Sequence, residues 1–162
     1  MAARADRDPR TLPHKLAQTL VAGPSAGPLA AASVLVRLGA GVTFVLFGIG
    51  KLTSHASEVA SFRAYGLPSP DAFVYVIGGV ELLGGALLIA GLTARIAALV
   101  LAGDMVGAII VSGIGRGELI SLTLAPALLA GMLLLLYAGP GPRALDRHLF
   151  EKQPRGAQRA SP

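Results

Sequence analysis

Cysteine is absent from the 162-residue sequence, and its absence excludes several kinds of chemistry. Without a thiolate the chain has no dithiol relay and no cysteine nucleophile. It also has no sulfur ligand for a metal ion and no cysteine-held iron–sulfur cluster.

Histidine is nearly as scarce. Of the three histidines, His14 and His148 lie near the ends of the chain and His55 lies between two apolar blocks. A haem held between helices usually needs two histidines on facing helices, and the sequence does not offer them. We therefore expect no metal site and no haem site built from this chain alone.

Charged residues are also few, at 14% of the chain against roughly 25% in an average soluble domain. Hydrophobic residues make up 53% and the mean hydropathy is +0.65. They are sorted into four blocks of about the ~20 residues that a membrane-spanning helix needs. The four blocks are Leu29 to Gly50, Ala72 to Leu92, Ile96 to Gly115 and Leu119 to Gly139.

The alternative for such blocks is a set of buried helices in a soluble core, which seldom exceed about 14 apolar residues. No amphipathic partner remains in the sequence to cover four helices that are hydrophobic on all sides. The sequence therefore predicts an all-α, integral membrane four-helix bundle. Pro126 is expected to kink the fourth span, which has no charge after Glu118 and is expected to face lipid or a neighbouring subunit.

The basic excess lies entirely at the two ends of the chain. Residues 1–28 hold four basic and two acidic residues, residues 140–162 hold five and two, and the middle holds five of each. By the positive-inside rule both ends are cytoplasmic, and Arg95, between the second and third blocks, lies on the same side. We expect a flexible N-terminal tail (1–28), a transmembrane domain (29–139) and a basic C-terminal tail (140–162) in a multi-pass protein of the cell (inner) membrane.

The tails contain no recognition motif or aromatic platform for nucleic acid, so membrane lipid is their expected partner. One or two helical turns are expected at Arg143 to Glu151.

The long connection "SHASEVASFRAYGLPSP" is typical of a short amphipathic helix. Ser54 can cap it, Val59, Phe62 and Tyr65 share one side, and Gly66 followed by two prolines ends it. We expect this helix to lie at the outer membrane surface, and an ordinary structured loop is the alternative.

Several charged residues interrupt the apolar blocks. Arg37, Gly41, Phe44, Gly48 and Lys51 line one face of the first span, because they follow one another at steps of four and three residues. Gly78, Glu81 and Gly85 share a side of the second span. In the third, Asp104 lies between Gly103 and Gly107, a spacing that allows another helix to come close.

We expect Arg37, Glu81 and Asp104 to meet in the bundle interior, because a lone charge at mid-bilayer costs about 2.5 to 3.5 kcal/mol and an arginine would satisfy the acids. Lys51, nearer the outer surface, would find Glu58 or Asp71. Since two acids face one arginine, one acid is expected to hold a proton. The cluster is either a structural element that fixes helix packing or a site that handles protons or orients a ligand such as a quinone headgroup.

These residues also carry a resemblance. The stretches "RLGAGVTFVLFGIGKL", "FRAYGLPSP" and "GGVELLGGALLIAGLTARIAALVLAGDM" resemble the DoxX family of small four-helix membrane proteins over about Val34 to Leu136. The shared features are an early arginine, Gly-x-x-Lys, Glu-x-x-Gly-Gly and a Gly-Leu-Thr-x-Arg turn. The matching positions are Arg37, Lys51, Glu81 and Arg95, whereas Asp104 is proposed on physical grounds alone and His55 is a further polar position beside them.

The resemblance implies an association with membrane redox systems, either quinone-reducing or linked to thiol chemistry. Because this chain has no cysteine, a partner or a bound small molecule would have to carry any sulfur chemistry. Three hypotheses follow: an accessory subunit of an oxidoreductase complex with the cluster near a quinone, a non-catalytic anchor or assembly subunit, and a small transporter or lipid-interacting protein. The first two imply a larger redox complex as partner and no self-contained enzyme.

Overall fold

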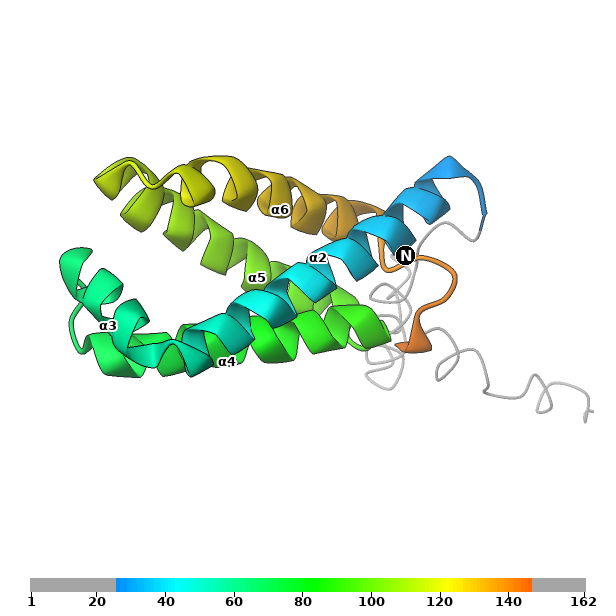
Figure 1. Cartoon of the computed structure of the whole chain (residues 1–162). Helices are drawn as coiled ribbons and strands as arrows, with labels where there is room; N and C mark the ends of the chain where they lie inside the picture. Colours follow the sequence, from blue (N-terminus) through cyan, green and yellow to red (C-terminus); the bar gives the residue numbers. More distant parts are fainter. Residues whose placement is uncertain (1–25, 147–162) are drawn as a thin grey trace, which may run out of the picture.

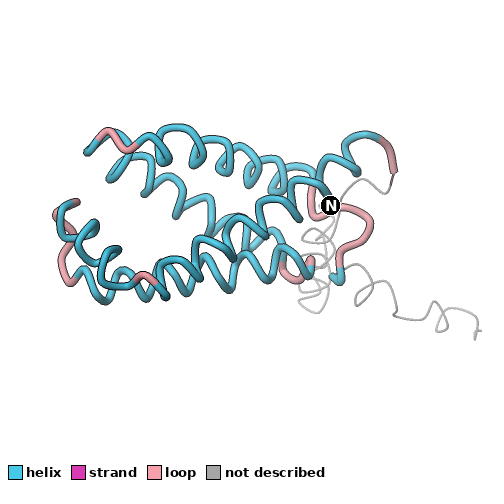
Figure 2. The backbone as a smooth tube through the Cα atoms, in the orientation of Figure 1, coloured by secondary structure: helices cyan, strands magenta, loops and turns pink. Residues whose placement is uncertain are grey.

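The computed structural model describes residues 26–146, which are helical over most of their length (Figure 1). Figure 2 shows helices joined by short loops, and no strand occurs in this part of the chain. The elements are α2 (Pro28–Thr53), α3 (His55–Ala64), α4 (Pro70–Ala90), α5 (Ala94–Ala108) continued by the π-helix η1 (Ile109–Ile114), and α6 (Leu119–Ala138).

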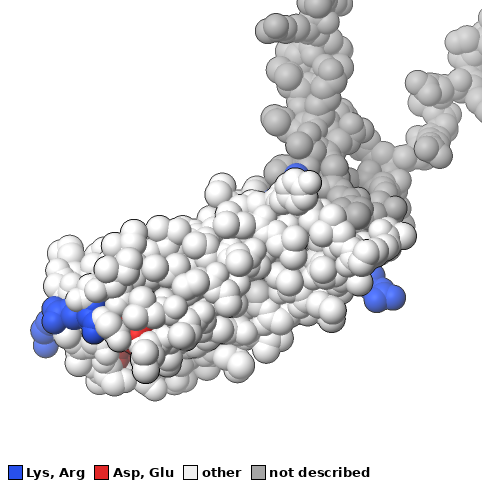
Figure 3. Space-filling view, turned by 90° about the horizontal axis from the view of Figure 1, so that it is seen from above, with Lys and Arg blue, Asp and Glu red and all other residues white. Residues whose placement is uncertain are grey.

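Four of these helical stretches are long and apolar enough to cross a membrane: Pro28–Thr53, Pro70–Ala90, Ala94–Ile114 and Leu119–Ala138. Their bounds lie within three residues of the predicted blocks, which confirms the all-α class and the four spans. On the face seen in Figure 3 an uncharged surface separates charged residues at the two ends. Such a surface suits a protein whose flanks contact acyl chains.

The four spans associate as two antiparallel pairs, α2 with α4 and α5 with α6. The pairs lie apart at the end that carries α3 and come together toward the end where the described chain begins and stops (Figure 1). We call these the α3 end and the termini end. The main core joins the pairs and includes Phe44 of α2, Leu88 of α4, Leu101 of α5 and Met132 of α6.

Glycine makes the contact between α2 and α4 unusually close. A Cβ atom added at Gly48 would lie 2.7 Å from the Gly78 carbonyl oxygen, and one added at Gly85 would lie 2.7 Å from that of Gly41. Neither position leaves space for a side chain, so the predicted glycine face on these two helices is correct.

Glycine has no such role on α5. Gly103 and Gly107 are exposed, and an added Cβ atom would have no neighbour within 4 Å at either residue. The prediction that they admit another helix is wrong, because α5 packs through a different side. That side is formed by the buried residues Ala97, Ala98, Leu101, Ala102 and Met105.

The connection between the first two spans is helical, as predicted. Val59 and Phe62 of α3 pack on Val74 of α4 in a small second core. Ser54 occupies the N-cap position, but its side chain makes no capping hydrogen bond. From this attachment α3 rises toward the other helix pair (Figure 1).

The third span changes to π-helical geometry near its end, which the sequence pattern does not show. Within η1, the Ser112 hydroxyl lies 2.8 Å from the Ala108 carbonyl oxygen and 2.6 Å from the Ser121 hydroxyl of α6, and it can donate its hydrogen to either oxygen. π-Helical turns are rare and are often found at functional sites. In the fourth span, α6 is helical on both sides of Pro126 and continues through it.

Residues 140–146, predicted as the start of a tail, pack on the termini end. Ala144 is fully buried and Asp146 is 5% exposed. The helical turns expected at Arg143 to Glu151 lie mostly outside the described residues. Of residues 143–146, which are described, Leu145 and Asp146 are helical.

Candidate functional site

A buried ion pair between α2 and α4 is the centre of the candidate site. The Lys51 ammonium lies 3.0 Å from Glu81 Oε1 and 2.8 Å from Oε2, and the Glu81 side chain is 5% exposed. The close α2–α4 packing positions the pair, since an added Cβ atom at Gly78 would lie 3.2 Å from Lys51 Cβ. The lysine side chain therefore reaches inward along α4 to a carboxylate about one turn beyond Gly78.

Asp104 of α5 adds a second acid to this pair. It is half-buried, its Oδ2 is enclosed and has no hydrogen-bond partner within the described residues, and it is near enough to interact electrostatically with Lys51 and Glu81. We call Lys51, Glu81 and Asp104 the acid–lysine cluster. With all three groups ionised it carries one surplus negative charge, so it suits the binding of a proton or a hydrogen-bond donor.

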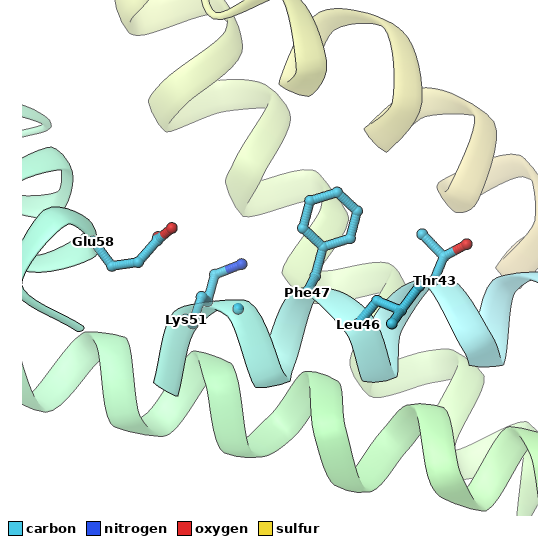
Figure 4. A pocket seen from close by; sticks show the side chains of 6 residues that line it. Thr43, Leu46, Phe47, Lys51 and Glu58 are labelled. Atoms are coloured by element: carbon cyan, nitrogen blue, oxygen red, sulfur yellow. The ribbon is translucent and has the colours of Figure 1, made fainter. Parts of the chain in front are cut away.

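An open pocket of about 300 Å³ adjoins the cluster. Its walls include Thr43, Leu46, Phe47 and Lys51 of α2 and Glu58 of α3. Figure 4 shows Glu58 reaching from α3 toward the side where Lys51 lies, with Phe47 rising from α2 toward α5 and α6. The Lys51 ammonium is 5.5 Å from the centre of the Phe47 ring, so the pocket combines an aromatic face with a cation.

A hydrogen-bonded chain joins the end of α3 to the second helix pair. The Tyr65 hydroxyl donates to Glu118 Oε2 at 3.2 Å, and Ser121 donates to the same oxygen at 2.8 Å. Partial burial and the neighbouring Glu118 raise the pKa of Tyr65 above its ordinary value. The tyrosine therefore remains a hydrogen-bond donor throughout the physiological range.

Arg37 does not join the acids, which corrects the expected cluster. Its guanidinium donates to the carbonyl oxygens of Leu88 at 3.0 Å and Ile89 at 3.1 Å, and more weakly to that of Arg143 at 3.5 Å. The last carbonyls of a helix have no partner within the helix, so the C-terminus of α4 offers Arg37 acceptors at its own height. Glu81 lies seven residues before Leu88, about 10 Å away along the axis.

The alignment of α2 beside α4 also corrects the expected partner of Lys51. Its bond is to Glu81, whereas Asp71 pairs with His55 Nε2 at 3.4 Å. The His55 ring also stacks on Tyr75 with ring centres 4.3 Å apart, so His55 joins the start of α3 to the start of α4. Arg95 lies at the opposite end, where it donates to the Tyr137 carbonyl oxygen at 3.5 Å.

Two further polar contacts of this region were also not predicted from the sequence. Asp146 accepts the backbone N–H groups of Thr93 at 2.9 Å and Ala94 at 3.3 Å, and so caps α5 from a distant part of the chain. The Tyr65–Glu118 bond likewise joins residues far apart in sequence. No local pattern marks either contact, because each depends on how the helices are arranged.

Within residues 26–146 no group of three or more histidine, aspartate or glutamate residues could hold a metal ion. The candidate site consists of the acid–lysine cluster and the adjoining pocket with its aromatic wall.

Comparison with known proteins supports the family. The sequence profile of the DoxX family matches residues 32–113, half of the chain. The chain is 30% identical over 133 residues to the Mycobacterium tuberculosis protein "Uncharacterized membrane protein Rv3486", covering 74% of this chain and 82% of that protein. It is 37% identical over 78 residues to the Bacillus subtilis protein "Putative oxidoreductase CatD", covering 48% and 57%.

No solved structure matches the chain significantly. The family match covers Arg37, Lys51, Glu81, Arg95 and Asp104. Because the family profile matches half of the chain and the mycobacterial relative is similar over most of it, the chain is a multi-pass membrane protein that belongs to the DoxX family.

Proposed function

We propose that this protein is an accessory membrane subunit of an oxidoreductase complex and that its acid–lysine cluster binds a quinone headgroup and handles its protons. The observation that carries the proposal is the Lys51–Glu81 pair beside an open pocket with an aromatic wall. The name of the Bacillus subtilis relative as an oxidoreductase adds support from the family.

The residues present fit a quinone headgroup. A volume of about 300 Å³ is at the lower end of small-molecule sites, which are mostly apolar with a few polar groups. Phe47 and Leu46 provide apolar contact, and Lys51 provides positive charge. A quinone, when bound, supplies carbonyl oxygens that accept hydrogen bonds and a ring that accepts two electrons and two protons.

The cluster supplies the complementary groups. A lysine ammonium has three N–H donors, and Glu81 engages two of them at most, which leaves one for a ligand oxygen. Glu81 and Asp104 can each hold and release a proton next to that oxygen. The electrons would come from a partner protein, so the chain acts as a subunit. Both termini are expected in the cytoplasm, from the basic excess at the chain ends.

Mild-detergent purification followed by mass spectrometry of the bound lipids and proteins tests this proposal. We expect a co-purified quinone, and calorimetric titration with a short-chain quinone should show binding. Lys51→Met should weaken that binding at least about tenfold, equal to about 1.4 kcal/mol. The matched control is Arg63→Met, an exposed cation on α3 outside the pocket. Equal affinity for both variants would contradict the proposal.

A second candidate, a non-catalytic anchor or assembly subunit, is favoured by α6. It is the least buried of the four spans, and Leu119, Leu133 and Tyr137 are each more than half exposed on it. Co-purification with a large complex whose turnover is unchanged by Glu81→Gln would favour the anchor. Loss of turnover with the complex intact would favour the quinone site.

A further inference from the structure

The two ends of the bundle differ in how they close, and this difference concerns the route by which protons reach the cluster. At the termini end, Arg37 is 3% exposed and Asp146 is 5% exposed. A Cβ atom added at Gly91 would clash with both Arg37 and Ala144. Side chains and backbone therefore fill this end around the turn between α4 and α5.

The α3 end remains open beside the cluster. The pocket extends along α2 from Lys51 to Thr43. Thr43 is ten residues before the end of α2 at Thr53, so the pocket reaches about 15 Å into the span. Glu58 of α3 lines the same pocket and is near enough to Glu81 for their charges to interact.

We propose that the acid–lysine cluster exchanges protons with water on the α3 side only, through this pocket and with Glu58 as its outer carboxylate. The inference rests on the proposed function, in which the cluster handles protons, and adds the side of the membrane that supplies them. By the expected orientation of the termini, this is the outer side.

The chemistry needs only water as the source of protons. Glu58 takes a proton from hydronium in the pocket, so an O–H bond of hydronium breaks as the Glu58 O–H bond forms. Lys51 transfers one of its N–H protons to Glu81, where an O–H bond forms, and the Glu58 O–H bond then breaks as its proton restores the N–H bond of Lys51. One bond to hydrogen breaks as another forms at each transfer, and charge is conserved.

The charged groups around Glu81 are Lys51 on α2, Glu58 on α3 and Asp104 on α5. The acid that α6 contributes at this end, Glu118, is hydrogen-bonded to Tyr65 and Ser121. Glu58 is therefore the acid that both lines the pocket and interacts with the ion pair.

Thiol labelling tests the sidedness, because an introduced cysteine is the only thiol in this chain. Thr43→Cys lines the pocket, whereas Val42→Cys is one residue away at nearly the same depth, exposed, and outside the pocket. Reconstituted vesicles are treated with a membrane-impermeant thiol reagent from either side. Arg63→Cys and Arg143→Cys, both exposed, mark the α3 side and the termini side.

We expect Thr43→Cys to react from the α3 side at least about tenfold faster than Val42→Cys, because only a hydrated thiol ionises to the reactive thiolate. Labelling of Thr43→Cys from the termini side, or at the rate of Val42→Cys, would overturn the proposal.

Infrared measurement of hydrogen–deuterium exchange tests the role of Glu58. The carboxyl band of Glu81 is assigned with Glu81→Gln and followed after transfer to heavy water, at a pH where titration of the band shows a proton. Glu58→Gln should slow the exchange by about 10²-fold, whereas Asp71→Asn, an exposed acid at the same end, should leave it unchanged. Unchanged exchange in Glu58→Gln would remove Glu58 from the route.

Neither readout requires a quinone, so the two proposals fail separately. One-sided labelling and Glu58-dependent exchange in a protein that binds no quinone would refute only the quinone assignment. Quinone binding without one-sided labelling would refute only the proton route.

Discussion

The termini end and the α3 end of the bundle use buried charge in different ways. At the termini end Arg37 and Asp146 bond to backbone groups that helix ends leave without partners, so each charge stabilises the fold. At the α3 end Lys51 and Glu81 bond to each other beside a pocket, with Asp104 nearby. A charge satisfied by fixed backbone has one arrangement, whereas a charge satisfied by another titratable side chain can change its state.

The largest expected effect comes from breaking the termini end. Arg37→Met should leave the last carbonyl oxygens of α4 without their donor and the buried Asp146 without the positive charge that interacts with it electrostatically, and we expect it to destabilise the protein by about 3 to 5 kcal/mol. Thermal unfolding in detergent, followed by circular dichroism, measures this loss. Arg63→Met is the exposed control, and equal unfolding temperatures for the two variants would show that Arg37 is not structural.

The next effect separates stability from binding at the α3 end. Lys51→Met leaves Glu81 unpaired in the interior and should cost about 2 to 3 kcal/mol. Lys51→Met combined with Glu81→Leu should recover most of that stability, because an apolar pair of similar volume can replace a buried ion pair. The double variant should nevertheless bind no short-chain quinone.

Calorimetric titration and thermal unfolding of the same preparations check both parts. A double variant that remains as unstable as Lys51→Met would mean that the cluster is needed for packing. The difference between the two ends would then disappear.

A smaller effect is expected from Asp146→Ala. Loss of the carboxylate removes the cap on the Thr93 and Ala94 N–H groups, which costs about 1 to 2 kcal/mol. Asp71→Ala, which removes a largely exposed carboxylate, is the control and should change stability little. Denaturation midpoints in detergent would show whether Asp146→Ala destabilises the protein more than Asp71→Ala does.

The smallest effect concerns the link between α3 and the second helix pair. Tyr65→Phe should cost about 1 kcal/mol through loss of the bond to Glu118. Burial and Glu118 raise the pKa of Tyr65 in the folded protein. Its contribution to stability should therefore be fully present below about pH 10, the ordinary phenol value, and fall as pH rises through the folded pKa.

Stability measured against pH in the native protein and in Tyr65→Phe checks this sign. The two curves should approach each other at alkaline pH. A constant separation would mean that the tyrosine stabilises the fold through packing alone.

The helices were predictable from the sequence because span length and periodicity are local properties. The partner of Glu81 was not predicted correctly, because it depends on the register between α2 and α4 and on the reach of lysine. One signal was available: Gly41 and Gly48, like Gly78 and Gly85, are seven residues apart, so the two antiparallel helices can match their glycines. That register places Arg37 beside Ile89, away from Glu81.

The remaining contacts lay beyond sequence reasoning for a different reason. Asp146 reaches α5 only because residues 140–146 fold back over the bundle, and Ser112 meets Ser121 only because α6 returns beside η1. Both are tertiary contacts of short polar side chains, which carry no periodic pattern. For Asp104 the sequence showed only an acid within an apolar helix, and it did not show that this acid lies near Lys51.

The π-helical turn in the third span changes the direction in which the side chains after it point. Such a turn holds one residue more than an α turn, so everything after it is rotated by about 100° from where an uninterrupted helix would place it. Within this turn Ser112 hydrogen-bonds with Ser121 of α6, so the extra residue lies where the third span contacts the fourth. A single additional residue thus resets the direction of the last residues of the span, and the chain needs no extra segment to make that change.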